Sequence, residues 1–303
     1  MRIGFAGAGA IGCHYGSKLK QAGDDVVLLA RGVHLQAMQK HGLKHESEGE
    51  QTSVQIEASH DVHAMADCQV IVISCKMTGL SDMIEMLKPV VTPAMLLVTL
   101  QNGVEAPDMV ATAFPGVAVA AGTAFIGARL ERPGFVIHSA AGGIRLGHWQ
   151  EGEGNRFLTP LLESFNDASV SAREDGNTAS MLWRKLLWNC GFNAITAITR
   201  RFAKDMAANH ESLIVVRQAM SEAVAVAQAL GVEKIDTSDI DKHIEVTLAM
   251  GPVKTSMWQD IDAGHKTEVD FINGYVARKG DELGLAADAN RILTTLMHAI
   301  EGQ

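Results

Sequence analysis

Long apolar runs are missing from this 303-residue chain. No run reaches the ~18 residues that a membrane-spanning helix needs, so we expect no membrane partner. The glycine-rich segment that begins at Gly7 follows the N-terminus too closely to leave room for the apolar core of a secretory signal peptide. These absences predict a cytoplasmic protein.

Cysteine is also scarce, and none of the four cysteines forms a Cys-x-x-Cys pair: they are Cys13, Cys68, Cys75 and Cys190. Each lies among apolar or small residues, which favours reduced thiols of the core over a redox role. No His-Glu-x-x-His motif or paired-cysteine ligand set is present, so the sequence predicts no metal site.

The chain has fewer basic than acidic residues: 26 lysines and arginines against 35 aspartates and glutamates, which gives a net charge of -9. This balance argues against a protein that binds nucleic acid by neutralising phosphates. Hydrophobic residues make up 47% of the chain and charged residues 20%, as expected for a well-packed soluble protein. The length is sufficient for two domains.

The first half alternates short apolar runs with helical patterns, which is typical of a parallel sheet with crossover helices. Apolar runs of this length fit strands that are covered on both faces. The expected strands are 3–6, 26–30, 69–74, 95–100 and 117–121. Helices are expected over 12–22, ended by Gly23 at the C′ position, and over 81–88, ended by Pro89.

From about residue 123 the pattern changes. Residues 135–138 and 144–147 predict antiparallel strands around the Arg132-Pro133-Gly134 turn. The polar stretch 150–155 predicts a loop, followed by a helix over 157–165 and a last short strand within 167–173.

Beyond about residue 177 the apolar residues recur at spacings of three and four, which predicts a mostly helical second half. The expected helices are 178–190, 211–230, 240–250, 267–283 and 287–300. The boundary falls near 173–177, so we expect a nucleotide-binding domain over residues 1–174 and a helical domain over 175–303.

A Gly-x-Gly-x-x-Gly pattern, formed by Gly7, Ala8, Gly9, Ala10, Ile11 and Gly12, follows the first strand and opens the first helix. This context is typical of a dinucleotide site. The first glycine permits the tight turn, the second lets the backbone approach a pyrophosphate, and the third lets helix and strand pack closely. The free N–H groups of the helix N-terminus would then meet the phosphates.

The end of the second strand predicts which dinucleotide is bound. Strands of NAD-binding proteins usually end here in an acidic residue that binds the ribose 2′-hydroxyl. This strand ends in Arg31, and a guanidinium can grip a 2′-phosphate, so NADP(H) is the expected cofactor. Lys76 and Asn102 follow two further strands, at the edge where open α/β sheets place ligands. Taken alone, each also fits an ordinary loop or turn residue.

Lys185, Asn189 and Asn193 form a polar stripe in an otherwise apolar segment. Each step of four residues advances about 400° around a helix, so the three side chains share one face. An ammonium and two carboxamides in apolar surroundings are costly unless a polar group meets them. A ligand with a carbonyl and a carboxylate would do so.

Together these motifs resemble the ketopantoate reductase (2-dehydropantoate 2-reductase) family over nearly the whole chain. The resemblance rests on the glycine pattern and on six further features: Arg31, Lys76, Gln101-Asn102-Gly103, Trp183-Arg184-Lys185 with Asn189 and Asn193, the segment 256–261 and the segment 266–274. It implies a Rossmann-type doubly wound domain, an all-helical C-terminal domain, and an active site in the cleft between them. It also implies NADPH-dependent reduction of ketopantoate to pantoate, on the route to pantothenate.

The resemblance further implies roles for individual residues. Lys185 would be the general acid, and Glu268 would lie by the reacting centre and the nicotinamide. Substrate contacts would come from Asn189, Asn193, Ser256 and Asn102. Cofactor contacts would come from the glycine loop and from Arg31, Lys76, Asn102, Ala128 and Glu268. An ammonium near a ketone stabilises the negative charge that hydride addition builds and supplies the proton.

Several alternatives remain open. Lys185 alone fits a lysine lying along apolar surface, Glu268 alone fits a helix N-terminal acid, and Ser256 with Gln259 fits a capping box. Many members of the family carry asparagine where this chain has Val253, which keeps another branched 2-keto acid open as the substrate. A non-catalytic NADP(H) sensor and a homodimer are further alternatives.

Overall fold

The computed structural model describes residues 1–302, which divide into two compact units. The first unit comprises Met1–Gln101 and Glu105–Thr178. The second comprises Asn102–Val104 and the chain from Ala179 onward. Each unit has its own core and is described separately below.

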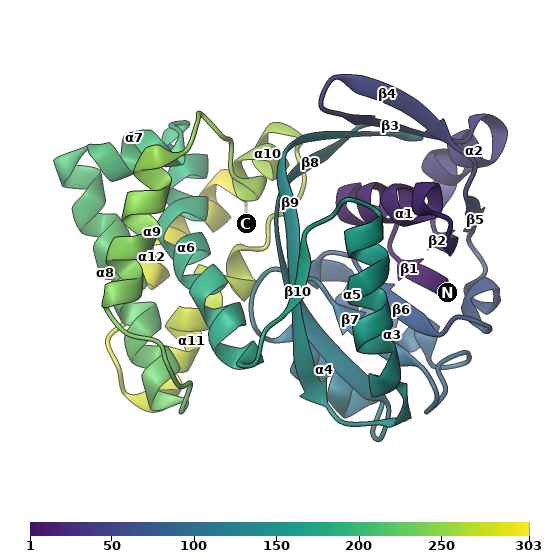
Figure 1. Cartoon of the computed structure of the whole chain (residues 1–303). Helices are drawn as coiled ribbons and strands as arrows, with labels where there is room; N and C mark the ends of the chain where they lie inside the picture. The colour runs from purple at the N-terminus through teal and green to yellow at the C-terminus, as the bar shows by residue number, and fades with distance from the viewer. Residues whose placement is uncertain (303) are drawn as a thin grey trace. The chain divides into compact units, whose positions relative to one another are not determined.

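The first unit is built on one ten-stranded sheet (Figure 1). Its strands are β1 (Arg2–Ala6), β2 (Asp25–Leu29), β3 (Leu43–Ser47), β4 (Glu50–Val54), β5 (Glu57–Ser59), β6 (Val70–Ile73), β7 (Leu96–Thr99), β8 (Ala118–Arg132), β9 (Phe135–Gln150) and β10 (Ala172–Glu174). The order across the sheet is β4-β3-β9-β8-β7-β6-β1-β2-β5, and β10 pairs with β9.

Strands β1, β2, β6, β7 and β8 pair in parallel, as the apolar runs predict. The short strand β5, which no apolar run predicts, pairs in parallel with β2. Apart from Arg2 and Asp25, the residues through which β1, β2, β6, β7 and β8 pair in parallel are buried whichever face they point to, because helices cover both sides. The helices of this unit are α1 (Ala10–Ala22), α2 (Gly32–His41), η1 (Val62–Met65), η2 (Met77–Gly79), α3 (Leu80–Leu87), α4 (Ala106–Ala113), η3 (Glu153–Phe157) and α5 (Leu158–Asp167). Helices α1 and α5 pack on each other, as do α3 and α4 (Figure 1).

The antiparallel part is larger than the sequence pattern predicts. Instead of two separate strands over 135–138 and 144–147, β9 is one continuous strand that pairs along most of β8. The ladder passes over Gly142, which lies opposite no residue of β8 and has a φ of 122°. A bulge of this kind keeps a strand paired through a segment whose alternation is broken. The expected loop at 150–155 also turns into η3 from Glu153.

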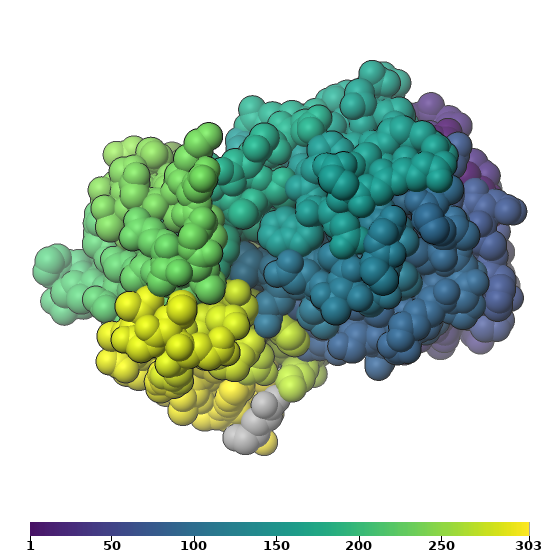
Figure 2. All heavy atoms as spheres, turned by 90° about the horizontal axis from the view of Figure 1, so that it is seen from below, coloured from purple at the N-terminus to yellow at the C-terminus, as the bar shows by residue number. Residues whose placement is uncertain are grey.

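Through residue 302, all regular elements of the second unit are helices. Its helices are α6 (Thr178–Thr199), α7 (Ala203–Ala208), α8 (His210–Ala229), α9 (Ser238–Ala249), α10 (Ser256–Asp262), η4 (Val269–Phe271), α11 (Asn273–Leu283) and α12 (Asp288–Glu301), of which α6 begins at the junction of the units. The α11 and α12 region, yellow in Figure 2, forms one face of this unit. The fold class predicted from the sequence, a Rossmann-type α/β part followed by an all-helical part, is confirmed.

Close packing around Gly191 fixes α6 against α8. A Cβ atom at this glycine would lie 2.4 Å from Cε of Met220 and 3.2 Å from Cγ1 of Val216. On α6, Trp183 also packs against Tyr275 of α11, with 6.0 Å between the ring centroids. Helix α6 is therefore held from two sides.

Among the helices of residues 1–302, none combines the length and the apolar character that a bilayer crossing requires.

Candidate functional site

The glycine loop joins β1 to α1 and tolerates no side chain at two of its three glycines. Gly7 has a φ of 120°, and a Cβ there would lie 2.6 Å from the backbone nitrogen of Cys75. A Cβ at Gly12 would lie 2.2 Å from the carbonyl oxygen of Gly7. The loop is therefore folded tightly onto itself and onto the end of β6.

Gly9 differs from the other two, because a Cβ there would meet nothing within 4 Å. Gly9 is the N-cap residue of α1, and no side chain forms a capping hydrogen bond at this end. The N-terminus of α1 therefore has no capping side chain, and the backbone at Gly9 has room beside it for a ligand, as an anion site at a helix N-terminus requires. These features fit a dinucleotide pyrophosphate.

Ser74 supports this loop, and the sequence interpretation missed it. Its hydroxyl donates to the carbonyl oxygen of Gly7 at 2.7 Å, and its backbone N–H donates to Ala6. On the other side, the N–H of Ala8 donates to the carbonyl of Leu29, at the end of β2. The only sequence signal for Ser74 is a polar residue directly after a buried strand.

The other residues expected at the cofactor lie in the same unit, except Asn102 and Glu268, which lie in the second. Arg31 is exposed, follows β2 and provides the backbone N-cap of α2. Lys76 is exposed, follows β6 by three residues and is the backbone N-cap of η2. Because β1, β2 and β6 are parallel neighbours, these residues share one edge of the sheet with the glycine loop. Ala128 lies farther along β8, opposite His138 at a register irregularity.

The polar stripe of the second unit lies on α6, as its spacing predicts, and two of its members are buried. Asn189 is 4% exposed and Asn193 is 1% exposed. Nδ2 of Asn189 and Oδ1 of Asn193 are both buried without a hydrogen-bond partner among the described residues. An unpaired buried amide group costs about 1–3 kcal/mol, so the fold itself does not account for these side chains.

Lys185, one turn before Asn189, is half-buried. Burial lowers the pKa of its ammonium to about 8, and the negative charge of Glu268 opposes that shift. A lysine in this range exchanges a proton readily near neutral pH. The electrostatic link with Glu268 also shows that these two residues lie near each other.

Glu268 is buried and accepts a hydrogen bond from Nδ2 of Asn102 at 2.8 Å. Glu268 is the N-cap residue of η4, as the helix N-terminal alternative predicts, but its side chain makes no capping hydrogen bond there. Asn102 follows β7 but belongs to the second unit. Asn102 is therefore more than a turn residue, because its side chain binds the Glu268 carboxylate.

Ser256 is the first residue of α10 and is exposed. The capping-box alternative for this serine is wrong, because the N-cap is Thr255, which accepts from the N–H of Trp258. The Thr255 hydroxyl also hydrogen-bonds the hydroxyl of Thr196 on α6 at 2.7 Å. The turn that carries Ser256 is therefore attached to α6 three residues beyond Asn193.

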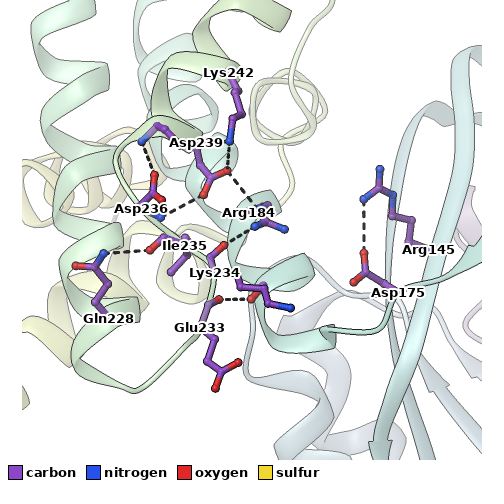
Figure 3. Close-up of polar contacts among 12 residues, drawn as sticks. Arg145, Asp175, Arg184, Gln228, Glu233, Lys234, Ile235, Asp236, Asp239 and Lys242 are labelled. Carbon is purple, nitrogen blue, oxygen red and sulfur yellow. Dashed lines mark hydrogen bonds and ion pairs between the residues drawn. The ribbon is translucent and has the colours of Figure 1, made fainter.

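A polar network fixes the start of α6 (Figure 3). Arg184, the neighbour of Lys185, contacts Asp239 of α9 at 3.4 Å and donates to the carbonyl of Lys234. Asp239 also accepts from Lys242 at 3.3 Å. These contacts hold the α6 turn before the polar stripe.

The candidate residues therefore form two sets. The glycine loop, Arg31 and Lys76 belong to the first unit, whereas Lys185, Asn189, Asn193, Glu268, Asn102 and Ser256 belong to the second. Within residues 1–302, no group of three or more histidine, cysteine or acidic side chains is arranged to hold a metal ion. The second set offers one ammonium, three carboxamides, a hydroxyl and a carboxylate, which suits a small anionic carbonyl compound.

Comparisons with known proteins identify relatives along the whole chain. A family model described as "Ketopantoate reductase PanE/ApbA" matches residues 3–151, and its C-terminal counterpart matches residues 177–301. The crystal structure of a PanE/ApbA family ketopantoate reductase from Ralstonia eutropha is 32% identical, covers 100% of this chain and 99% of its own, and has a TM-score of 0.90.

Two further relatives differ in their activities. A 2-dehydropantoate 2-reductase from Nostoc sp. is 29% identical over 288 residues, covering 94% of this chain and 90% of its own. The ternary structure of D-mandelate dehydrogenase with NADH and anilino(oxo)acetate is 25% identical, with a TM-score of 0.93, and covers 100% of this chain and 99% of its own.

Proposed function

The chain belongs to the ketopantoate reductase family of oxidoreductases, and from this premise we propose that it reduces ketopantoate (2-dehydropantoate) to pantoate with NADPH. The reaction would serve pantothenate biosynthesis. We propose the cytoplasm as its compartment, because the four free cysteines suit a reducing environment.

One observation carries the proposal. Two buried amide atoms, Nδ2 of Asn189 and Oδ1 of Asn193, have no partner among the described residues, on the same helix as a lysine of lowered pKa. A donor and an acceptor left unpaired in this way match a ligand that both accepts and donates hydrogen bonds. A 2-keto acid with a hydroxyl group, such as ketopantoate, meets both requirements.

The chemistry follows from these side chains. A bound nicotinamide supplies the hydride for the ketone carbon. Lys185 stabilises the negative charge that develops on the carbonyl oxygen and donates its proton there. Glu268 keeps the ammonium charged, because its carboxylate raises the lysine pKa against the effect of burial. The amides orient the substrate without adding charge.

Arg31 supports NADP(H) as the cofactor. Its guanidinium is exposed at the end of β2 and carries the charge that a 2′-phosphate requires. The fit of the glycine loop to a pyrophosphate supports a dinucleotide in either phosphorylation state, so the choice between NADP(H) and NAD(H) rests on this one residue.

A second candidate is the reduction of another branched or aromatic 2-keto acid. Two observations favour it: Val253 is apolar and 37% exposed, and a relative of the same fold is a D-mandelate dehydrogenase bound to NADH. Mandelate is the 2-hydroxy acid of an aromatic 2-keto acid and lacks the second hydroxyl of pantoate.

The test is oxidation of NADPH and of NADH against a panel of 2-keto acids that includes ketopantoate, 2-ketoisovalerate and benzoylformate. We expect the highest kcat/KM for ketopantoate with NADPH. A higher value for 2-ketoisovalerate or benzoylformate would replace the first candidate with the second. Tight binding of NADPH with no turnover of any acid would instead identify a sensor.

A further inference from the structure

Asn273 is a fully buried amide that joins two segments of the candidate site. It is the first residue of α11, and its Nδ2 donates to the carbonyl oxygen of Cys190 at 3.0 Å and to Oδ1 of Asn290 at 2.9 Å. Cys190 lies in the middle of α6, directly after Asn189. Asn273 therefore attaches the beginning of α11 to the turn of α6 that carries the unpaired amides.

Asn290, on α12, is held in turn by Glu222 of α8. Nδ2 of Asn290 donates to Oε2 of Glu222 at 2.8 Å and to the carbonyl of Ala219 at 2.9 Å. The Glu222 carboxylate also accepts the backbone N–H groups of Ala289 and Asn290, at 3.0 Å each. A buried carboxylate at a helix N-terminus with several N–H donors is well compensated. The series of hydrogen bonds thus begins at the buried Glu222 carboxylate, which several N–H donors hold in place.

This series of hydrogen bonds ends at Asn273, which lies close to Glu268 in the sequence. Only the short helix η4 and Ile272 separate Glu268 from Asn273, and the N–H of Phe271 in η4 donates to the Glu268 carbonyl at 3.0 Å. A displacement at Asn273 would therefore be transmitted to Glu268 within one turn of chain. Glu268 is the residue whose charge acts on Lys185.

We propose that Asn273, supported by Asn290 and Glu222, is a positioning residue that holds the Glu268 turn against the α6 face bearing Lys185, Asn189 and Asn193. This inference rests on the proposed function for its catalytic consequence. Asn273 touches neither substrate nor cofactor in this account, and it acts through the separation of the Glu268 carboxylate from the Lys185 ammonium.

Replacing Asn273 by alanine removes both donors and leaves Cys190 and Asn290 in place. With the turn released, the Glu268 carboxylate moves away from the Lys185 ammonium, so the Lys185 pKa should fall below about 8, because the charge of Glu268 opposes the lowering by burial. We expect kcat to fall at least tenfold, while the KM for NADPH changes less than twofold.

The experiment measures two quantities on Asn273→Ala and Asn273→Ser. The first is kcat and KM for the best 2-keto acid. The second is the Lys185 pKa in the ligand-free enzyme, by NMR of the ¹³C-dimethylated amine assigned with Lys185→Arg. Asn273→Ser keeps one donor and is expected to give an intermediate effect, which preserves the test if the alanine variant does not fold.

Thr247→Val is the matched control. Thr247 is equally buried, and its hydroxyl donates to the His243 carbonyl and accepts from Nε1 of Trp188 on α6. This variant should lose thermal stability but keep the wild-type Lys185 pKa and kcat.

Unchanged Lys185 pKa and kcat in Asn273→Ala and Asn273→Ser, with only a lower melting temperature, would overturn the inference. A shifted pKa in an enzyme that turns over no 2-keto acid would uphold the positioning role and refute the proposed function. The two failures are therefore distinguishable.

Discussion

At the scale of the residue, the unpaired amide atoms of Asn189 and Asn193 on α6 should lower the stability of the ligand-free protein and raise its affinity for a ligand. An amide whose polar atom lacks a partner destabilises the ligand-free protein, whereas the same atom stabilises a complex. This opposition separates Asn189 and Asn193 from Asn290, a buried asparagine of the second unit whose Nδ2 donates to Ala219 and whose Oδ1 accepts from Asn273.

The first prediction concerns Asn189→Leu. The substitution is close in volume and removes the unpaired Nδ2, so the free energy of unfolding should rise by about 1 kcal/mol. The KM for the 2-keto acid should rise more than tenfold. Thermal unfolding and steady-state kinetics measure the two effects. Asn290→Leu is the control and should lose stability, because its amide is hydrogen-bonded; a similar loss in Asn189→Leu would show that Asn189 is structural.

The second prediction concerns Arg31→Ala. Loss of the guanidinium removes the partner expected for the 2′-phosphate, so the KM for NADPH should rise at least tenfold while that for NADH changes little. Steady-state kinetics with each dinucleotide measures both values. Equal effects on the two cofactors would remove Arg31 from the account of specificity.

At the scale of the element, the loop between β1 and α1 contains two glycines with different expected roles. Gly9 leaves room for a ligand, whereas Gly12 is required by the packing of the loop. Gly9→Ala should fold with an unchanged melting temperature, since a Cβ there meets nothing within 4 Å. The same methyl group would occupy the space in front of the α1 N-terminus, so we expect the Kd for NADPH to rise at least tenfold in fluorescence titration. Unaltered binding would mean that the pyrophosphate does not approach this backbone.

Gly12→Ala provides the contrast, because its Cβ would lie 2.2 Å from the Gly7 carbonyl oxygen. This variant should lose both stability and NADPH binding. A loss confined to binding would show that the loop accommodates a side chain at this position.

The sequence predicts the elements whose burial imposes a periodic pattern. The parallel strands are readable because both faces are covered, and α1 ends at Gly23, as predicted, with a φ of 108°. The hairpin β3–β4 was not predicted, because its residues are mostly polar and its pairing with β9 depends on contacts remote in sequence. The full length of β9 was hidden by the bulge at Gly142.

The candidate site shows the same limit. Helical spacing is sufficient to place Lys185, Asn189 and Asn193 on one face. It does not reveal that two amide atoms lack partners, that Asn102 binds Glu268, or that Ser74 supports Gly7, because each depends on tertiary packing. The role of Ser256 as a helix cap failed because the neighbouring Thr255 takes that position.

At the scale of the whole molecule, a histidine cluster joins α1 to the antiparallel part of the first unit. Nδ1 of His14 lies 2.9 Å from Nε2 of His45 on β3, and the ring of His138 on β9 lies 4.3 Å from that of His14. Burial, with the charges of neighbouring histidines and Lys18, lowers the pKa of His14 to about 2 and that of His45 to about 4. Both rings are therefore neutral in the folded protein near pH 5.

This cluster predicts loss of stability in acid. The unfolded chain binds protons at these histidines below the usual pKa of 6.5, whereas the folded chain does not, so their contribution is complete above pH 6.5 and declines as the pH falls toward 4. At pH 5, each of the two buried histidines should lower the free energy of unfolding by about 2 kcal/mol relative to pH 7.5. Urea unfolding at pH 7.5 and 5.0 measures the difference.

Two variants control this prediction. His14→Leu should reduce the pH-dependent loss by about half. His60→Gln, at an exposed position, should leave it unchanged. An equal loss in wild type and His14→Leu would place the acid sensitivity elsewhere.

The most direct test of the enzymatic account is the pH dependence of kcat for ketopantoate reduction by NADPH, in the wild type and in Lys185→Ala. We predict that wild-type kcat falls as the pH rises through about 8, because the Lys185 ammonium loses the proton it must donate. Lys185→Ala should lose this pH-dependent limb and about 10²–10⁴-fold in kcat. Full turnover in the variant, with the same alkaline limb as the wild type, would contradict the assignment of Lys185 as the acid.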